Sequence, residues 1–323
     1  MSFNPFVLND TLSLIIHWID QYTNTYDTKI TKVCLKLTCK LIFAEIMLNK
    51  NQQIDLFMML TTSKINNKEI SKWFYNPSYY DNIWTSYYAA KTNDLEMLRL
   101  CHLNGCSGDS VTCQYAAAGG HLGVLKYLHE NGCCWDYTSC EQAALGGHLD
   151  VLKYLYENGC RWNSWSCYFA AGNGHLDVLK YLHENGCPWN ELTCRAAASN
   201  GQLNVLKYLR ENGCSWDYTS CEYAASGGHL DVLKYLYENG CHWDSWSCYF
   251  AAQNGHLDVL KYLHENGCPW NESTCRTAAS NGQLNVLKYL RENGCHLGPK
   301  ACEQAALHGH LDVLKYLREN GCP

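Results

Sequence analysis

The stretch GHLDVLKYLHENGCPWN at residues 174–190 decides the fold, because the same seventeen letters return at residues 255–271. Self-similarity at a fixed period is the signature of a repeat architecture. The triplet Asn-Gly-Cys begins at nine positions, each 27 residues after the one before: Asn104, Asn131, Asn158, Asn185, Asn212, Asn239, Asn266, Asn293 and Asn320. The two quoted copies lie 81 residues apart, which is three periods. We therefore predict about nine 27-residue units, with a block of three units duplicated in tandem.

The unit at residues 135–160, WDYTSCEQAALGGHLDVLKYLYENGC, predicts two helices. Cys140, Ala143 and Ala144 stand at i, i+3 and i+4, so they share one face of a short first helix. Gly147 provides a left-handed stop, and Gly159 ends the second helix. The second helix carries a wider apolar face made of Leu149, Val151, Leu152, Tyr154 and Leu155, and its Asp150 favours the positive end of the helix dipole. A lone hairpin of this size leaves apolar surface exposed, so we expect consecutive units to stack.

Charge and hydropathy exclude several classes of protein. The 323-residue chain carries 25 Lys and Arg against 31 Asp and Glu, and from Asp81 onward the balance is 17 against 25. An acidic array is a poor ligand for nucleic acid, which is bound by clustered basic residues. No apolar run reaches the roughly 18 residues of a membrane span, and the opening residues lack the basic start of a signal peptide. These features predict an intracellular and cytoplasmic protein that binds neither nucleic acid nor membrane.

The 21 cysteines are mostly periodic, at the Asn-Gly-Cys triplet and again seven residues on, as at Cys160 and Cys167. A free cysteine packs as a small hydrophobic residue, so we predict buried thiols repeated by copying. Zinc is the sharper alternative, but structural zinc sites favour ligands two to four residues apart and no such pair recurs. Redox chemistry and occasional disulfides are further alternatives. We predict no cofactor and no metal.

The order Ala-Ala-x-x-Gly-His-Leu-Asp-Val-Leu-Lys-x-Leu-x-Glu-x-Gly at residues 143–159, 170–186 and 251–267 resembles the ankyrin repeat. The Asn-Gly-Cys-x-Trp motif resembles that of ankyrin proteins from mimivirus-like giant DNA viruses. An ankyrin unit has about 33 residues, so each unit here lacks about six, where the family builds a projecting β-hairpin. Thr138, Ser139, Cys140 and Glu141 stand where the family has Thr-Pro-Leu-His. The resemblance implies an all-α, ankyrin-type solenoid that binds proteins.

Two other residue types recur once in most units. Tryptophan follows the Asn-Gly-Cys triplet at Trp135, Trp162, Trp189, Trp216, Trp243 and Trp270. A large aromatic side chain can seal the junction left open by the missing hairpin; a ladder that binds a ligand is the alternative. Histidine stands in the Gly-His-Leu turn at His148, His175, His229, His256 and His310. The resemblance implies a structural role for these histidines, and we find no catalytic constellation, so we predict that the protein is not an enzyme.

Recognition is expected where the units differ. The residue after the first-helix cysteine varies, and so does its neighbour, and both point away from the stack if the cysteine and the Ala-Ala pair face it. The neighbouring positions include Ala196 and Thr277. In ankyrin-type solenoids this side lines the concave groove that binds partners. The predicted protein-binding residues are Glu141, Tyr168, Arg195, Glu222, Tyr249, Arg276 and Glu303, with Phe169, Tyr223 and Phe250 beside them. We name the full set the ladder; a solvated face copied by duplication is the alternative.

The first 80 residues differ from the array. Residues 1–50 predict two apolar helices and resemble an F-box, in which Leu-Pro-x-Glu-Leu-Leu-x-x-Ile precedes a Val-Cys-Lys segment; here Asn9 replaces the proline. The resemblance implies contact with a Skp-type linker through Leu8, Leu12, Ile15, Ile16, Val33 and Cys34. A plain helical cap on the first repeat is the alternative. Residues 51–79 are interpreted as an adaptor segment that leads into the array at residues 80–323.

These features predict a protein–protein interaction module. The leading hypothesis is a substrate adaptor of a cullin-type ubiquitin ligase, whose repeat groove holds a host target protein in the host cytoplasm if the source is viral. The alternative is a plain ankyrin scaffold without a ubiquitin role. The last unit has the sequence of an interior repeat, although the outer face of a terminal repeat is usually polar. Its last face is therefore expected to be exposed or to be covered by another chain through end-to-end self-association.

Overall fold

The computed structural model describes residues 83–103 and 105–322. It divides the chain into two units, residues 1–79 and residues 80–323. The F-box-like contact residues Leu8, Leu12, Ile15, Ile16, Val33 and Cys34 lie outside the described residues. The predicted contact with a Skp-type linker therefore stays a prediction.

Nine helical hairpins make up the described part of the second unit, which contains no strand. In each hairpin a first helix is followed after a short turn by a second helix that packs against it. The first helices are α5 (Ile83–Lys91), α7 (Ser110–Ala118), α9 (Tyr137–Gly146), α11 (Ser164–Gly172), α13 (Glu191–Ser199), α15 (Tyr218–Gly227), α17 (Ser245–Asn254), α19 (Glu272–Ser280) and α21 (Pro299–Leu307). The second helices are α6 (Leu95–Leu103), α8 (Leu122–Glu130), α10 (Leu149–Glu157), α12 (Leu176–Glu184), α14 (Leu203–Glu211), α16 (Leu230–Glu238), α18 (Leu257–Glu265), α20 (Leu284–Glu292) and α22 (Leu311–Glu319). The predicted all-α solenoid is confirmed.

Local sequence sets the ends of these helices. The Asp or Asn that follows the repeated tryptophan is the N-cap of the first helix: the Asp136 carboxylate accepts the Thr138 N–H at 3.1 Å, and the Asn163 side chain accepts the Trp165 N–H at 2.9 Å. Such a cap stabilises a helix by about 1 kcal/mol. At the other end Gly147 has φ 74°, a left-handed conformation that stops α9 as predicted.

The core consists of the same few positions in every hairpin. Cys140, Ala143 and Ala144 of α9 have no exposed surface, and neither do Leu152 and Leu155 of α10. Burying one leucine side chain stabilises the fold by roughly 1.5–3 kcal/mol. Since each hairpin contacts the hairpins before and after it, stacking completes the core that a single unit cannot close.

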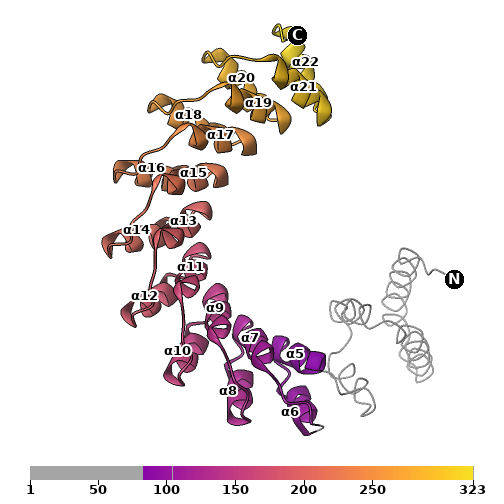
Figure 1. Cartoon of the computed structure of the whole chain (residues 1–323), viewed down its shortest axis with the longest axis vertical. Helices are drawn as coiled ribbons and strands as arrows, with labels where there is room; N and C mark the ends of the chain where they lie inside the picture. Colours follow the sequence, from indigo (N-terminus) through magenta and orange to yellow (C-terminus); the bar gives the residue numbers. More distant parts are fainter. Residues whose placement is uncertain (1–82, 104, 323) are drawn as a thin grey trace, which may run out of the picture. The chain divides into compact units, whose positions relative to one another are not determined.

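The stack curves because its two helix layers pack differently. First helices contact their neighbouring first helices extensively through small alanine and cysteine side chains, whereas neighbouring second helices touch less. Figure 1 shows the consequence: the odd-numbered helices lie on the inner side of the curved stack and the even-numbered helices on the outer side. At the C-terminal end of the stack Leu307 and Leu311 are 73 % and 76 % exposed, as expected for a last unit with the sequence of an interior repeat.

Candidate protein-interaction surface

The ladder lies on the first helices, on the inner side of the stack (Figure 1). Two of its residues contact the N-cap residue of the next repeat, 22 positions further along the chain. The Asn163 side chain donates to a Glu141 carboxylate oxygen at 2.9 Å. The Arg195 guanidinium donates to an Asp217 carboxylate oxygen at 3.1 Å. These two ladder positions therefore connect adjacent repeats.

Exposure differs along the ladder. Glu141, Tyr168, Arg195, Glu222, Tyr249 and Arg276 are half-buried, as are Phe169 and Phe250, whereas Tyr223 and Glu303 are exposed. The expectation that both positions point away from the stack is wrong at Ala196 and Thr277, which are each 5 % exposed. A short side chain at this position does not extend past the neighbouring first helix, so it is covered.

Two exposed tryptophans of this face were not predicted from the sequence as binding residues. Trp165 is 48 % exposed and lies 5.1 Å from the Tyr168 ring, with Phe169 also adjacent. The duplicated block repeats this group with Trp246, which is 53 % exposed, beside Tyr249 and Phe250. Both tryptophans occupy the second position of a first helix. A tryptophan there, outside the 27-residue tryptophan series, was the available signal.

The two ladder arginines differ in their partners. Arg195 pairs with Asp217 and also lies over the Tyr223 ring, with its Cζ atom 5.7 Å from the ring centroid. At the equivalent place after Arg276 the sequence has Gly298 in place of the aspartate. Arg276 instead donates to the Ser273 hydroxyl at 3.3 Å. Within the described repeats, Arg276 has no carboxylate partner and its charge is available to a ligand.

Glu222 lies in an acidic part of the ladder. Burial raises the pKa of its carboxyl group, and the negative charges of Asp244 and Asp217 raise it further, while Arg195 acts in the opposite direction. Glu141 occupies the same place in the first block, where Asn163 supplies a hydrogen-bond donor. Asp244 replaces that asparagine in the second block, so the donor is lost and a like charge takes its place.

The repeated tryptophans pack between the second helices, and the prediction that they seal the junctions between repeats is confirmed. Trp189 stacks on His183 at 3.8 Å between ring centroids and meets Tyr208 of the next repeat edge-on at 6.2 Å. Trp162 stacks on Tyr156, Trp243 on Tyr237, Trp135 on His129 and Trp270 on His264. Trp216 instead lies under the Arg210 guanidinium. A lysine of the preceding second helix lies over the same tyrosine, as Lys180 lies over Tyr208. Each of these six junctions is therefore held by a stack of aromatic and cationic side chains.

The histidines of the Gly-His-Leu turn also connect repeats. His148 Nε2 lies 3.0 Å from the carbonyl oxygen of Ala118, at the end of the preceding first helix. His121, His175, His229, His256 and His310 make the equivalent contact with Lys91, Leu145, Ser199, Ser226 and Ser280. The ring N–H satisfies a carbonyl that the helix end leaves without a partner. Their predicted structural role is confirmed.

Apart from the half-buried Cys106, the periodic cysteines are buried as predicted, but their pairing was not predicted. The two cysteines that lie seven residues apart in sequence are not partners; each first-helix cysteine contacts the one 20 residues later, at the end of the same hairpin. The sulfur atoms are 3.1 Å apart at Cys140 and Cys160 and 3.2 Å apart at Cys194 and Cys214, and Cys275 is bonded to Cys295. Across the described residues no group of three or more His, Cys, Asp or Glu side chains is arranged to hold a metal ion.

The chain is thus a solenoid of stacked helical hairpins whose inner face carries exposed aromatic side chains. Residues 167–245 and 248–323 match a family model of ankyrin repeats in three copies, and residues 140–183 match a model of ankyrin repeats in many copies. These matches together cover more than half of the chain, which belongs to the ankyrin repeat family. A comparison with curated proteins found no significant match. None of the described helices is both long and apolar enough to cross a membrane.

Proposed function

We propose that this protein is a protein–protein interaction module that binds its partner along the ladder and the two tryptophan groups of the inner face. The observation that carries this proposal is the half-exposure of Trp165 and Trp246. Burying such a ring in an interface removes a large apolar area from water, and tryptophan, tyrosine and arginine are the residues that most often dominate binding energy. The two rings occupy identical settings three repeats apart, so a single extended partner can engage both.

A pair of variants tests this surface. Trp165→Ala and Trp246→Ala, combined in the full chain, should weaken capture of crosslinked partners at least tenfold while the melting temperature stays within about 2 °C, because both side chains are exposed. Trp165→Phe with Trp246→Phe is the matched control and should retain most binding. Unchanged capture by the alanine variant would show that the partner binds elsewhere.

The finer hypothesis is a substrate adaptor of a cullin-type ubiquitin ligase, with the F-box-like residues 1–50 binding a Skp-type linker and the groove holding a target protein. The F-box-like sequence motif in that segment supports the adaptor hypothesis. Full-length protein carrying Leu12→Asp and Ile16→Asp should lose a purified Skp-type linker, whereas the double tryptophan variant should keep it. Absence of linker binding by the unmodified chain would leave the plain ankyrin scaffold as the function.

Two further proposals follow from the same reasoning. The exposed Leu307 and Leu311 at the last hairpin support end-to-end self-association. Light scattering at increasing concentration should then show a rising mass, and Leu311→Asp should abolish the rise; a constant monomer mass would refute it. The giant-virus resemblance supports a partner from the host and a site of action in the host cytoplasm, which crosslinking in infected cells would identify.

A further inference from the structure

The first junction of the array lacks the tryptophan that fills the six junctions after it. In the linker after α6 the residues are Ser107 and Gly108, and Gly108 stands 27 residues before Trp135, where six consecutive later repeats have tryptophan. The residue that would stack on this tryptophan is retained: His102 stands 27 residues before His129, whose ring lies 4.1 Å from that of Trp135. The edge-on tyrosine is also retained as Tyr127, 6.2 Å from His102.

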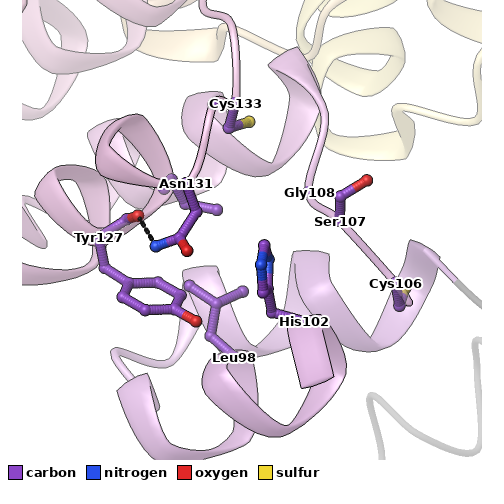
Figure 2. A pocket seen from close by; sticks show the side chains of 10 residues that line it. Leu98, His102, Cys106, Ser107, Gly108, Tyr127, Asn131 and Cys133 are labelled. Carbon is purple, nitrogen blue, oxygen red and sulfur yellow. Dashed lines mark hydrogen bonds between the residues drawn. The ribbon is translucent and has the colours of Figure 1, made fainter. Parts of the chain in front are cut away.

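A cavity lies where the missing side chain would be. It has a volume of about 180 Å³ and is lined by Leu98 and His102 of α6, Tyr127 and Leu128 of α8, and the linker at Gly108. Figure 2 shows His102 on one helix and Tyr127 on the neighbouring helix, both lining this space. Asn131 closes one side, with its side-chain amide held on the Tyr127 carbonyl oxygen at 2.7 Å. A cavity of about 150 Å³ is sufficient to bind a benzene ring in a protein.

We propose that this cavity is a binding site for an indole ring, supplied by a tryptophan side chain of a partner polypeptide. The same molecule contains six versions of the filled site, so the chemistry that recognises indole is visible within it. In five of them a histidine or tyrosine ring stacks on the indole, and in the sixth the Arg210 guanidinium does. A tyrosine of the next repeat meets each indole edge-on, as Tyr154 meets Trp135 at 6.0 Å. At the first junction these groups are present, and the ring that they hold elsewhere is absent from the described residues.

The site is separate from the ladder. It lies between second helices, on the outer side of the stack, whereas the ladder lies on the first helices. The proposal therefore does not depend on the inner-face proposal. A partner that inserts a tryptophan here would reproduce a junction that the later repeats make for themselves.

Ligand-observed fluorine NMR on the full chain tests the site, with fluoroindole as the first probe and fluorinated N-acetyltryptophanamide as the second. The unmodified protein should bind one equivalent of each probe. Gly108→Trp should abolish binding by filling the site; its Cβ would lie 2.8 Å from a terminal methyl group of Leu128, which can move. His102→Ala should weaken binding without adding a new ring. It tests the site independently if Gly108→Trp misfolds.

Two controls fix the location. Gly123→Trp places an indole on the surface of α8, where an added Cβ meets nothing within 4 Å, and should leave binding unchanged. Trp189→Gly should open an equivalent site at a later junction and raise the stoichiometry from one to two. The proposal fails if the unmodified chain binds neither probe, or if Gly108→Trp binds as well as the unmodified chain. If fluoroindole binds but fluorinated N-acetyltryptophanamide does not, the ligand is not a tryptophan of a polypeptide, and that part of the proposal fails.

Discussion

The sulfur atoms of Cys140 and Cys160 lie 3.1 Å apart within one hairpin, so they join the first turn of α9 to the loop that follows α10. Cys140 has no exposed surface and Cys160 is 3 % exposed. The Cys160 sulfur also lies 3.2 Å from the carbonyl oxygen of Asp136, the N-cap of α9, so the thiol closes the hairpin through a hydrogen bond. The first repeat has Ser86 at the position of Cys140, and its hydroxyl lies 3.5 Å from the Cys106 sulfur.

We expect mild peroxide to link the cysteines that lie 20 residues apart. One thiol is oxidised to a sulfenic acid with release of water, and its partner displaces a second water to form the disulfide. The hydrogen bond that Cys140 donates to Cys160 raises the pKa of the Cys140 thiol and lowers the pKa of Cys160, so Cys160 should react with peroxide first. Alkylation followed by peptide mapping should show Cys140 joined to Cys160.

The chain contains its own controls for this reaction. Cys106 faces a serine, and Cys134 is exposed beside the paired Cys133, so neither should enter an intramolecular bridge of this spacing. Cys160→Ser should leave Cys140 open to alkylation after peroxide, with the other pairs unaffected. Bridges that form at random spacings, or chiefly through Cys134, would contradict the expectation.

Asp244→Asn should stabilise the protein by about 0.5–1 kcal/mol at neutral pH. The new amide can donate to Glu222 as Asn163 donates to Glu141, and it still caps α17, since asparagine and aspartate are equally good caps. Denaturant unfolding measures the change. Asn163→Asp in the first block is the mirror experiment and should destabilise by a similar amount.

The advantage of Asp244→Asn should depend on pH. Because the pKa of Glu222 is raised in the folded state, the folded protein holds this proton more tightly than the unfolded chain, so stability falls as pH rises through that pKa. Below it Glu222 is neutral and the repulsion from Asp244 disappears. The difference between the variant and the unmodified chain should therefore shrink in acid, and a difference that is constant with pH would count against the charge explanation.

Trp189→Ala should destabilise the array by about 3 kcal/mol, because it removes the stack on His183 and the edge contact with Tyr208 and leaves the junction open. Since neighbouring repeats stabilise one another in part through such junctions, the unfolding transition should also broaden. Trp246→Ala is the matched control: this tryptophan is exposed on the inner face, and its loss should change stability by less than about 0.5 kcal/mol. Equal effects of the two substitutions would refute the sealing role.

His148→Ala should cost about 1 kcal/mol through loss of the hydrogen bond to the Ala118 carbonyl oxygen. His148→Gln should recover most of that loss. Glutamine occupies the same turn position at Gln202 and Gln283, and the Gln283 side chain donates to the Gln253 carbonyl oxygen at 3.5 Å. Thermal unfolding of the two variants checks this, and an equal loss for both would mean that the ring acts by packing.

Much of the fold could be predicted from the sequence because it depends on local, periodic patterns. The spacing of Cys140, Ala143 and Ala144, the stop at Gly147 and the apolar face of α10 each follow from helix geometry within one 27-residue unit. Nine copies then require stacking, since no single hairpin can bury its apolar side. The repeat period, the two helices and their buried faces were therefore determined by the sequence itself.

Contacts between positions far apart in the chain were decided only by the tertiary structure. The paired cysteines lie 20 residues apart, Asn163 and Glu141 lie 22 apart, and His148 and Ala118 lie 30 apart. No short sequence motif contains both partners of any of these contacts. The exposure of Trp165 and the burial of Ala196 likewise depend on how far a side chain reaches past the adjacent first helix. Sequence periodicity states which positions are equivalent, but the distance between two equivalent positions is set by how tightly the hairpins pack.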